Sequence, residues 1–209
     1  NVTLLFAVAR YAEVAEAYIK GLEQRLAAGK PVDRVASVAS FFVSRVDTAV
    51  DRLLESRPEG EALLGKTAIA NARAAYAKFL EIFDGARFAK LKEAGAQVQR
   101  LLWASTGTKN PSYSDVLYVE ELIAERTVNT MPPATFEAYR DHGQPAARLL
   151  PALAEAPRTL QQVAALGIDL DAITEQLERE GVEAFIASYR NLLQALTAKM
   201  AALKQQAEA

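Results

Sequence analysis

Short apolar segments alternate with longer amphipathic segments along this chain. Residues 2–6, 35–43, 99–105 and 127–131 are short, mostly apolar runs, which we predict to be strands of a parallel sheet buried on both faces. Residues 7–26 and 64–83 repeat apolar side chains every three or four positions, as amphipathic helices do, and residues 48–54, 87–94 and 115–122 are predicted to be short helices. This alternation predicts an α/β fold built of βαβ units.

The last part of the chain is predicted to be wholly helical. Thr159 and Gln162 have the spacing of a capping box, and Gly167 is the expected C-cap of the helix that they begin. Either Asp169 or Asp171 is expected to cap the next helix.

A long amphipathic stripe closes the sequence. We expect the helix that starts near residue 170 to end near Gly181. Beyond it, large apolar side chains recur at spacings of three and four: Val182, Phe185, Ile186, Tyr189, Leu192, Leu193, Leu196, Met200 and Leu203. Such a face is usually buried against the body of the protein.

The element order predicts a half-barrel. Four strand–helix units followed by terminal helices are half of a (β/α)8 TIM barrel, which takes about 250 residues in full. On this interpretation residues 1–150 form the half-barrel and residues 151–209 form a helical extension that packs on it. A small open α/β sheet is the alternative. The chain begins at Asn1, inside the first predicted strand, so we expect an excerpt of a longer protein.

The composition excludes several classes of site. The 209 residues include no Cys and a single His, so there is no disulfide, no Cys-ligated zinc or iron–sulfur site and no two-His metal site. A formal charge of −2 gives no electrostatic reason to expect nucleic acid or an anionic membrane as a partner. No apolar run approaches the roughly 20 residues of a membrane span. The lack of Cys fits a reducing compartment, and we expect a cytoplasmic protein.

Residues 60–67 match the phosphate-binding P-loop pattern. A working P-loop lies between a strand and a helix, and its backbone N–H groups wrap the phosphates. The segment before Gly60 is predicted to be helical, and the residues between Gly60 and Gly65 are helix formers. We therefore expect Gly65 to end a turn and Lys66 to begin the next helix, without a nucleotide site.

Ser40, Ser44 and Arg45 follow the second predicted strand and are candidates for an anion site. Parallel α/β folds bind ligands at the carboxyl ends of their strands, and the guanidinium fork of Arg fits phosphate bidentately. A surface ion pair of Arg45 with Asp47 or Asp51 accounts for the same residues equally well.

The loop after the third predicted strand has a similar composition. Ser105, Thr106, Gly107, Thr108 and Lys109 combine hydroxyls, a flexible glycine and one cation, as an oxyanion-binding loop does. The alternative is an ordinary strand-to-helix loop with Lys109 in water.

Polar residues on the first strand are further candidates. Asn1 and Thr3 are two positions apart and therefore face the same side of the strand, where they would line the site. His142 could act as a general base, although a lone His after a helix is more often a capping or packing residue.

Four of these segments together resemble the transaldolase family. They are residues 1–6 (NVTLLF), 36–47 (ASVASFFVSRVD), 102–111 (LWASTGTKNP) and 127–132 (TVNTMP). The resemblance is to the branch found in actinobacteria and cyanobacteria, sometimes fused to glucose-6-phosphate isomerase, and it covers nearly the whole chain. It implies a (β/α)8 barrel with additional C-terminal helices, of which this chain would be the C-terminal half, strands five to eight.

The resemblance also implies a reaction. A transaldolase transfers a dihydroxyacetone unit from a ketose phosphate to an aldose phosphate in the pentose phosphate pathway, through a lysine Schiff base and without a cofactor or metal. In the family the lysine lies on the fourth strand, and the acid/base carboxylates lie on the first and third. All three would be upstream of Asn1, so this chain alone would be inactive. Within the chain, Asn1 would bind the substrate and Thr3 would position the catalytic water.

The remaining site residues carried over from the family bind the substrate. Ser40 and Arg45 would hold its phosphate, which favours the anion site over the ion pair. Lys109 falls near a second phosphate-binding Arg of the family, although the loop is longer here, and Ser105 would contact sugar hydroxyls. The partners implied are sugar phosphates and the upstream half of the barrel, with no nucleic acid and no membrane.

Two other hypotheses remain open. A non-catalytic phosphosugar-binding half-barrel would bind sugar phosphates through Arg45 without turnover. A helical interaction module would use the apolar face of residues 182–203 as a partner surface. A half-barrel on its own also leaves open strand edges and interior side chains exposed, so the chain expressed alone is expected to dimerise, aggregate or remain molten.

Overall fold

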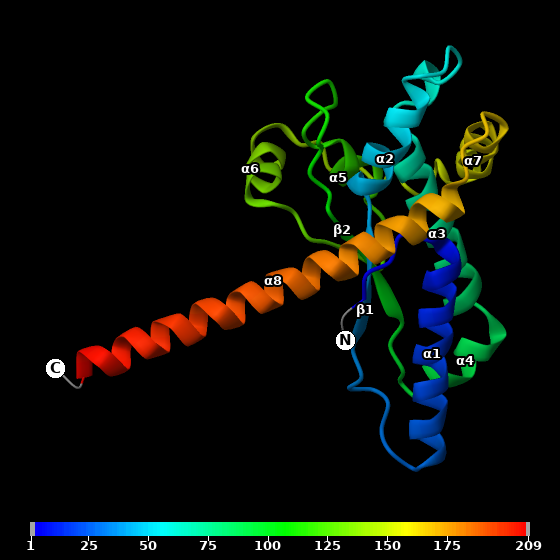
Figure 1. Cartoon of the computed structure of the whole chain (residues 1–209). Coiled ribbons are helices and arrows are strands. Elements are labelled where there is room, and N and C mark those ends of the chain that lie inside the picture. Colours follow the sequence, from blue (N-terminus) through cyan, green and yellow to red (C-terminus); the bar gives the residue numbers. More distant parts are fainter. Residues whose placement is uncertain (1–2, 208–209) are drawn as a thin grey trace.

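The computed structural model describes residues 3–207 and has the α/β alternation that the sequence predicts (Figure 1). Its elements in chain order are α1 (Val8–Ala27), β1 (Ser37–Phe42), α2 (Ser44–Leu54), η1 (Glu61–Leu63), α3 (Thr67–Phe83), α4 (Ala86–Glu93), β2 (Gln99–Ala104), α5 (Leu117–Glu121), β3 (Thr127–Asn129), α6 (Pro133–His142), η2 (Leu153–Glu155), α7 (Ala156–Ala165) and α8 (Leu170–Ala207).

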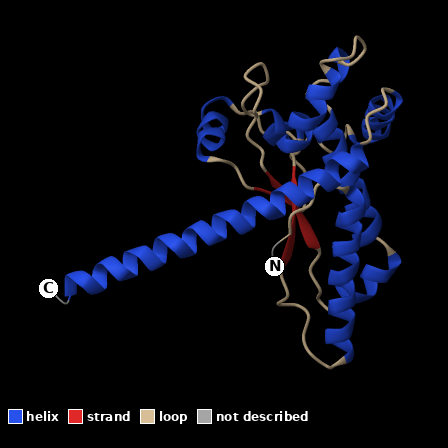
Figure 2. Cartoon of the chain, viewed as in Figure 1, coloured by secondary structure: helices blue, strands red, loops and turns tan. Residues whose placement is uncertain are grey.

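The strands form one parallel sheet in the order β1-β2-β3 (Figure 2). β1 runs in register with β2 from Ser37 opposite Gln99 onward, and β2 pairs with β3 from Leu101 opposite Thr127. Neighbours in the sheet are thus also neighbours in the chain, with helices in the connections.

A fourth strand was expected at residues 2–6, and the described part of that segment forms only a bridge. The Leu5 N–H donates to the Ser40 carbonyl at 3.1 Å, and the Leu5 carbonyl accepts from the Phe42 N–H at 2.8 Å. This parallel bridge lies on the edge of β1 away from β2. The prediction of a full strand is therefore wrong for residues 3–6, because the Ser40 N–H, which would continue the ladder, donates to Oγ1 of Thr3 rather than to a backbone carbonyl.

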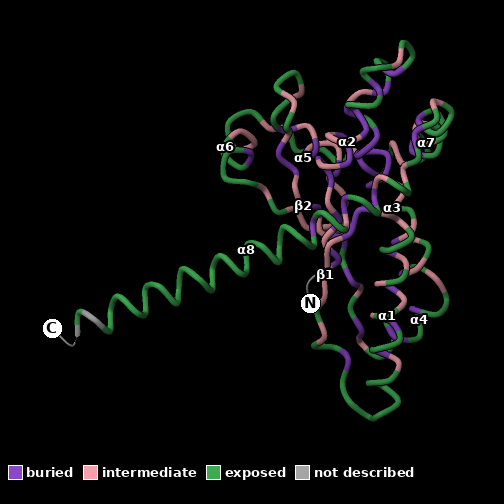
Figure 3. The backbone as a smooth tube through the Cα atoms, in the orientation of Figure 1, coloured by how far each residue is buried: buried purple, intermediate pink, exposed green. Residues whose placement is uncertain are grey.

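The two faces of the sheet are buried to different extents. Ala39, Phe41 and Trp103 are fully buried, and the Phe41 and Trp103 rings meet edge to face at 6.1 Å. The opposite face carries Ser40 in register with Leu102, which are both partly exposed. Side chains alternate between faces along a strand, so one face is packed under helices while the other is only partly covered by the described residues (Figure 3).

Helix α3 anchors the segment that precedes α1. The buried amide of Asn71 donates to the Phe6 carbonyl at 2.7 Å, and α1 and α3 pack side by side. The indole N–H of Trp103 donates to the Leu122 carbonyl at 3.0 Å and so joins β2 to the end of α5. These bonds satisfy backbone groups that would otherwise be buried without a partner.

Several predicted helix boundaries are wrong. α2 begins at Ser44 rather than at residue 48. α7 begins at Ala156, so Thr159 lies inside the helix, where its hydroxyl donates to the Glu155 carbonyl at 3.4 Å instead of forming a capping box. Gly167 does follow the end of α7 with a φ of 74°, the left-handed conformation that glycine adopts most easily.

α8 is longer than predicted because it does not end at Gly181. Asp169 caps it by accepting from the Ala172 N–H at 3.0 Å, and the helix then runs unbroken through Gly181. A Cβ at Gly181 would lie 2.6 Å from Cδ2 of Leu4. The glycine therefore allows the N-terminal segment to pass close to α8, rather than ending the helix.

Candidate functional site

The carboxyl ends of β1 and β2 bring two of the predicted site segments together. The Val43 N–H donates to the Ala104 carbonyl and the Ser44 N–H to the Ser105 carbonyl, both at 3.0 Å. The hydroxyls of Ser44 and Ser105 are 2.9 Å apart and hydrogen-bonded. Ser105 has a φ of 57°, a conformation uncommon outside glycine, and this strained turn leads the chain out of β2 toward Lys109.

Arg45, the second residue of α2, lines a cavity of about 660 Å³ between α2 and α8. Lys109 and Arg52 line the same cavity, to which α8 contributes Glu180. Among residues 3–207, none of the three cations forms an ion pair within the chain. Unpaired cations that share one cavity attract an anion, and Arg45 and Lys109 follow adjacent parallel strands, Arg45 in the first turn of α2 and Lys109 in the loop after β2.

Asp47 is buried on the other side of α2 and binds groups other than Arg45. Its Oδ1 accepts from the Ala68 N–H at 2.6 Å, and its Oδ2 accepts from the Tyr118 hydroxyl at 2.8 Å. Burial raises the pKa of Asp47 to about 7, although both of these hydrogen bonds favour the ionised form. Asp47 therefore joins α2 to the start of α3 and to α5.

Asp51, one helical turn later, is held in the same way. Its Oδ1 accepts from the Gly65 N–H at 3.2 Å, and its Oδ2 accepts from the Tyr113 hydroxyl at 2.8 Å. Burial raises the pKa of this carboxyl too, and it raises the pKa of the Tyr113 hydroxyl. The structure thus excludes a surface ion pair of Arg45 with either aspartate.

Thr3 and Ser40 are also brought together, at the edge of β1 that faces the N-terminal segment. The Ser40 N–H donates to Oγ1 of Thr3 at 2.6 Å, so the two hydroxyl-bearing residues lie on neighbouring segments. Asn1 lies outside the described residues. Neither Ser40 nor Ser105 lines the cavity of Arg45. The predicted residues that the structure describes therefore lie in three places: Arg45 with Lys109, Thr3 with Ser40, and Ser105 beside Ser44.

Three residues near the cavity were not among the candidates predicted from the sequence: Arg52, Tyr113 and Tyr118. Arg52 follows Arg45 by seven residues, which is about two helical turns and places both on one face of α2. That spacing could have identified Arg52 from the sequence. No sequence pattern indicates the hydrogen bonds of Tyr113 with Asp51 and of Tyr118 with Asp47, because they join residues far apart in the chain.

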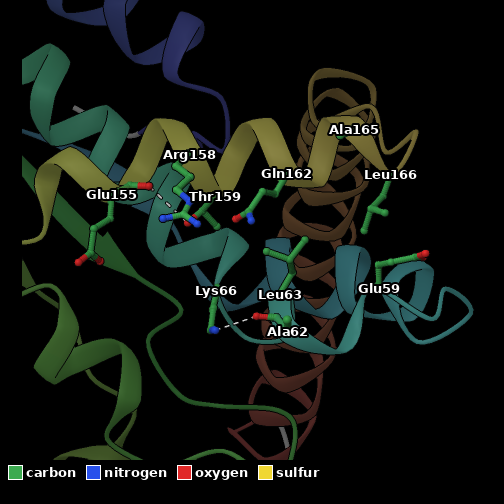
Figure 4. Close-up of a pocket in the computed structure, with 10 residues that line it drawn as sticks. All are labelled: Glu59, Ala62, Leu63, Lys66, Glu155, Arg158, Thr159, Gln162, Ala165 and Leu166. Carbon is green, nitrogen blue, oxygen red and sulfur yellow. Dashed lines mark hydrogen bonds between the residues drawn. The ribbon is translucent and has the colours of Figure 1, made fainter.

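The P-loop pattern does not form a phosphate cradle. α2, a helix, precedes it in place of a strand, and the Gly65 N–H donates to a carboxylate. Lys66 donates to the Ala62 carbonyl at 2.7 Å. Lys66 and Ala62 line a pocket of about 660 Å³ (Figure 4), in which the carboxylates of Glu59 and Glu155 offset the charges of Lys66 and Arg158. Gly65 has a φ of 70° and α3 begins at Thr67, so the segment ends in a turn before a helix, as expected.

His142 is an exposed residue at the end of α6. Its Nε2 lies 2.9 Å from Asp115 and its Nδ1 3.2 Å from Asp141, and the hydrogen bond with Asp115 is the main cause that raises its pKa. An imidazole held between two carboxylates joins α6 to the loop before α5, which is a structural role.

No group of three or more His, Cys, Asp or Glu side chains in residues 3–207 is arranged to hold a metal ion. Within the same residues, no helix is both long enough and apolar enough to cross a membrane.

These features define a parallel α/β protein with a cationic cavity beside the carboxyl ends of adjacent strands. The profile of the Transaldolase/Fructose-6-phosphate aldolase family matches residues 1–196, and the chain belongs to this family. It is 51% identical over 208 residues to a transaldolase of Mycolicibacterium smegmatis, covering 98% of this chain and 56% of the relative. A transaldolase of Saccharopolyspora erythraea is 53% identical over 195 residues, which are 93% of this chain and 53% of that protein. The chain thus spans about half the length of the curated relatives it matches.

Proposed function

We propose that this chain is the C-terminal half of a transaldolase and that the full-length protein, with an upstream half, transfers a dihydroxyacetone unit between sugar phosphates. The observation that carries the proposal is the convergence of unpaired Arg45 and Lys109 on one cavity beside the strand ends. The family supplies the reaction, and the cavity supplies a place for the phosphate that both substrates share.

The sheet supports a half-barrel over an open doubly wound sheet. The Leu5 segment, β1, β2 and β3 are parallel neighbours in chain order, as consecutive barrel strands are, whereas doubly wound sheets reverse their strand order at a switch point. We assign these four segments to strands five to eight. In a closed barrel the partly covered face with Ser40 and Leu102 would be the interior. Residues 1–150 would then be the half-barrel and residues 151–209 its helical extension.

The residues of this chain bind and orient the substrate. The guanidinium of Arg45 holds the phosphate as a bidentate fork, and Lys109 adds a second positive charge from the neighbouring loop. The family resemblance assigns Ser40 to the same phosphate, although Ser40 does not line the cavity of Arg45, and it assigns Ser105 to sugar hydroxyls. Thr3, which accepts from the Ser40 backbone N–H, positions the catalytic water.

The bond-breaking step depends on the upstream half. An upstream lysine amine condenses with the ketone and releases water, and the protonated imine then takes the electron pair as the C–C bond breaks. The first aldose phosphate leaves, the retained three-carbon carbanion attacks the second aldehyde, and water releases the new ketose phosphate. Asn1 would hydrogen-bond the substrate. The reaction needs no cofactor or metal, and we assign it to the pentose phosphate pathway in the cytoplasm.

Borohydride trapping tests the assignment of the lysine. The full-length protein is incubated with fructose 6-phosphate, reduced with borohydride and digested, and the masses of the peptides are measured by mass spectrometry. We expect a dihydroxyacetone adduct on one lysine upstream of Asn1. An adduct on a lysine within residues 1–209, or no adduct at all, would refute the proposal.

A matched pair of arginine variants tests the phosphate site. Arg45→Gln in the full-length protein removes a charge-assisted hydrogen bond worth about 1.5–3 kcal/mol, so we expect KM for the sugar phosphate to rise at least tenfold. Arg34→Gln removes an equal charge from an exposed position before the amino end of β1, and its KM should stay within twofold of wild type. Equal effects of the two substitutions would place the phosphate elsewhere.

A further inference from the structure

Lys109 lies in the loop of residues 105–116, which leads from the end of β2 to the start of α5. Among residues 3–207 its side chain has no hydrogen bond and no ion pair, and the residue is exposed. Because nothing in the described chain holds the ammonium group itself, its place in the cavity of Arg45 depends on how the backbone of the loop is held.

The backbone of this loop turns directly after Lys109. The side-chain oxygen of Asn110 accepts from the Ser112 N–H at 2.9 Å, and the carbonyl of the same residue accepts from the Tyr113 N–H at 3.1 Å. An asparagine that closes its own turn in this way restricts the backbone on both sides of it. The position of Lys109 is therefore coupled to that of Tyr113, four residues later.

The side chain of Tyr113 attaches this turn to α2. Its hydroxyl donates to Oδ2 of Asp51 at 2.8 Å, and Oδ1 of the same carboxylate accepts from the Gly65 N–H at 3.2 Å. A Cβ at Gly65 would lie 2.9 Å from Cζ of the tyrosine ring, so the glycine leaves room for the ring to lie here. Because α2 also carries Arg45, one helix both presents the arginine and anchors the loop of Lys109.

Two adjoining cavities show where Lys109 lies relative to this anchor. Asp51 and Tyr113 line a cavity of about 270 Å³, to which Arg52 and Lys109 also contribute. Arg52 and Lys109 line the cavity of Arg45 as well, whereas Asp51 and Tyr113 do not. Lys109 thus lies between the anchor and the cavity of Arg45. A displacement of the turn at Tyr113 would move the ammonium group relative to the guanidinium of Arg45.

We propose that Tyr113 and Asp51 are positioning residues, which hold Lys109 at the distance from Arg45 that a phosphate group requires. This inference rests on the proposed function, because it takes the cavity of Arg45 to be the phosphate site. Neither positioning residue lines that cavity, so both act through Lys109. The charge of a carboxylate on its own opposes the binding of an anion. What Asp51 contributes to phosphate binding is therefore the place that it gives to Lys109.

A double-mutant cycle in the full-length protein tests the positioning, with the binding of inorganic phosphate measured by calorimetry. Tyr113→Phe removes only the hydroxyl, and we expect the Kd for inorganic phosphate to rise about fivefold. In the Lys109→Gln background the same substitution should change this Kd by less than about twofold, because no ammonium group is left to position. KM for fructose 6-phosphate should rise in parallel with Kd, while kcat stays within about twofold, because the phosphate is bound equally before and during the reaction.

Tyr118→Phe is the matched control. It removes a hydroxyl that donates to the other buried aspartate of α2, Asp47, also at 2.8 Å, but Tyr118 lies in α5 and not in the loop. Its Kd for inorganic phosphate should stay within about twofold of wild type. Asp51→Ser is a second reporter, in case Tyr113→Phe does not fold. By charge alone this substitution would strengthen phosphate binding, so weaker binding would show that the anchor has been lost.

The outcomes separate this inference from the proposed function. An equal rise of Kd in both Lys109 backgrounds, or an equal effect of Tyr118→Phe, would overturn the positioning and leave the function standing in a protein that still transfers dihydroxyacetone. Tighter phosphate binding by Asp51→Ser would overturn it too. If Lys109→Gln itself leaves the Kd unchanged, Lys109 does not bind phosphate and the inference fails with it. An effect of Tyr113→Phe that requires Lys109, in a protein without transfer activity, would support the positioning and refute the proposed function.

Discussion

Asp47→Asn should stabilise the protein at neutral pH and change little at acidic pH. The carboxyl of Asp47 is 1% exposed, and burial raises its pKa from an ordinary 3.8 to about 7. Between these two pH values the folded protein binds up to one proton more than the unfolded chain, so its stability falls as pH rises. At 1.36 kcal/mol per proton and pH unit, the loss reaches about 4 kcal/mol and is complete above pH 7.

The variant removes this dependence because asparagine resembles the protonated acid. Its amide oxygen can accept from the Ala68 N–H, and its NH₂ can donate to the Tyr118 oxygen. Relative to wild type, Asp47→Asn is expected to differ by less than about 1 kcal/mol near pH 4.5 and to be more stable by up to about 4 kcal/mol near pH 8. The neighbouring carboxyl of Asp51, whose pKa is also raised by burial, is present in both proteins and contributes in the same sense to both.

Urea unfolding of the full-length protein at several pH values measures the difference. Asp33→Asn, at an exposed position, is the matched control and should stay within about 0.5 kcal/mol of wild type throughout. A competing account is that Asp47 stays ionised, because it accepts from the N-terminus of α3, where a helix favours negative charge. In that case Asp47→Asn would be destabilising at pH 8, and the reasoning from burial would be refuted.

The remaining predictions concern packing in the full-length protein and are read from thermal unfolding. Gly60→Ala places a Cβ 2.2 Å from the Leu54 carbonyl oxygen and should destabilise the protein by about 1–3 kcal/mol. Gly21→Ala, with open space in mid-helix, should stabilise it by up to about 1 kcal/mol, and equal effects of the two substitutions would contradict the close approach at Gly60. Trp103→Phe leaves the Leu122 carbonyl without its donor and should cost about 1–3 kcal/mol, so an unchanged midpoint would show that the bond contributes nothing.

Local sequence patterns predicted the elements whose partners are also local. The spacing of apolar residues placed α1 and α3 within a few positions, because one buried face determines such helices. The prediction that a helix ends at Gly181 was wrong because this position needs a glycine to avoid a clash with Leu4, which is far away in the sequence. The start of α2 was missed because Ser44 and Arg45, which follow a strand, resemble loop residues.

The candidate site likewise contains residues whose placement follows from local patterns and residues whose placement depends on distant segments. The proximity of Arg45 and Lys109 could be predicted because the carboxyl ends of parallel strands meet at one edge of the sheet. Asp47 and Asp51 were considered only as surface partners of Arg45. Whether a carboxylate is buried depends on what packs over it, and here the tyrosines of a distant segment do so.

The contact of Leu4 with Gly181 has a consequence for how the protein is made. One of these residues is among the first of this chain to leave the ribosome, and the other follows only after nearly all the rest. The strands can pair as they emerge, but this contact must wait until residue 181 has been synthesised. Contacts between distant parts of a chain slow folding and leave apolar surface exposed meanwhile. A ribosome stalled before α8 should therefore hold a nascent chain that binds chaperones, and release of α8 should end that binding.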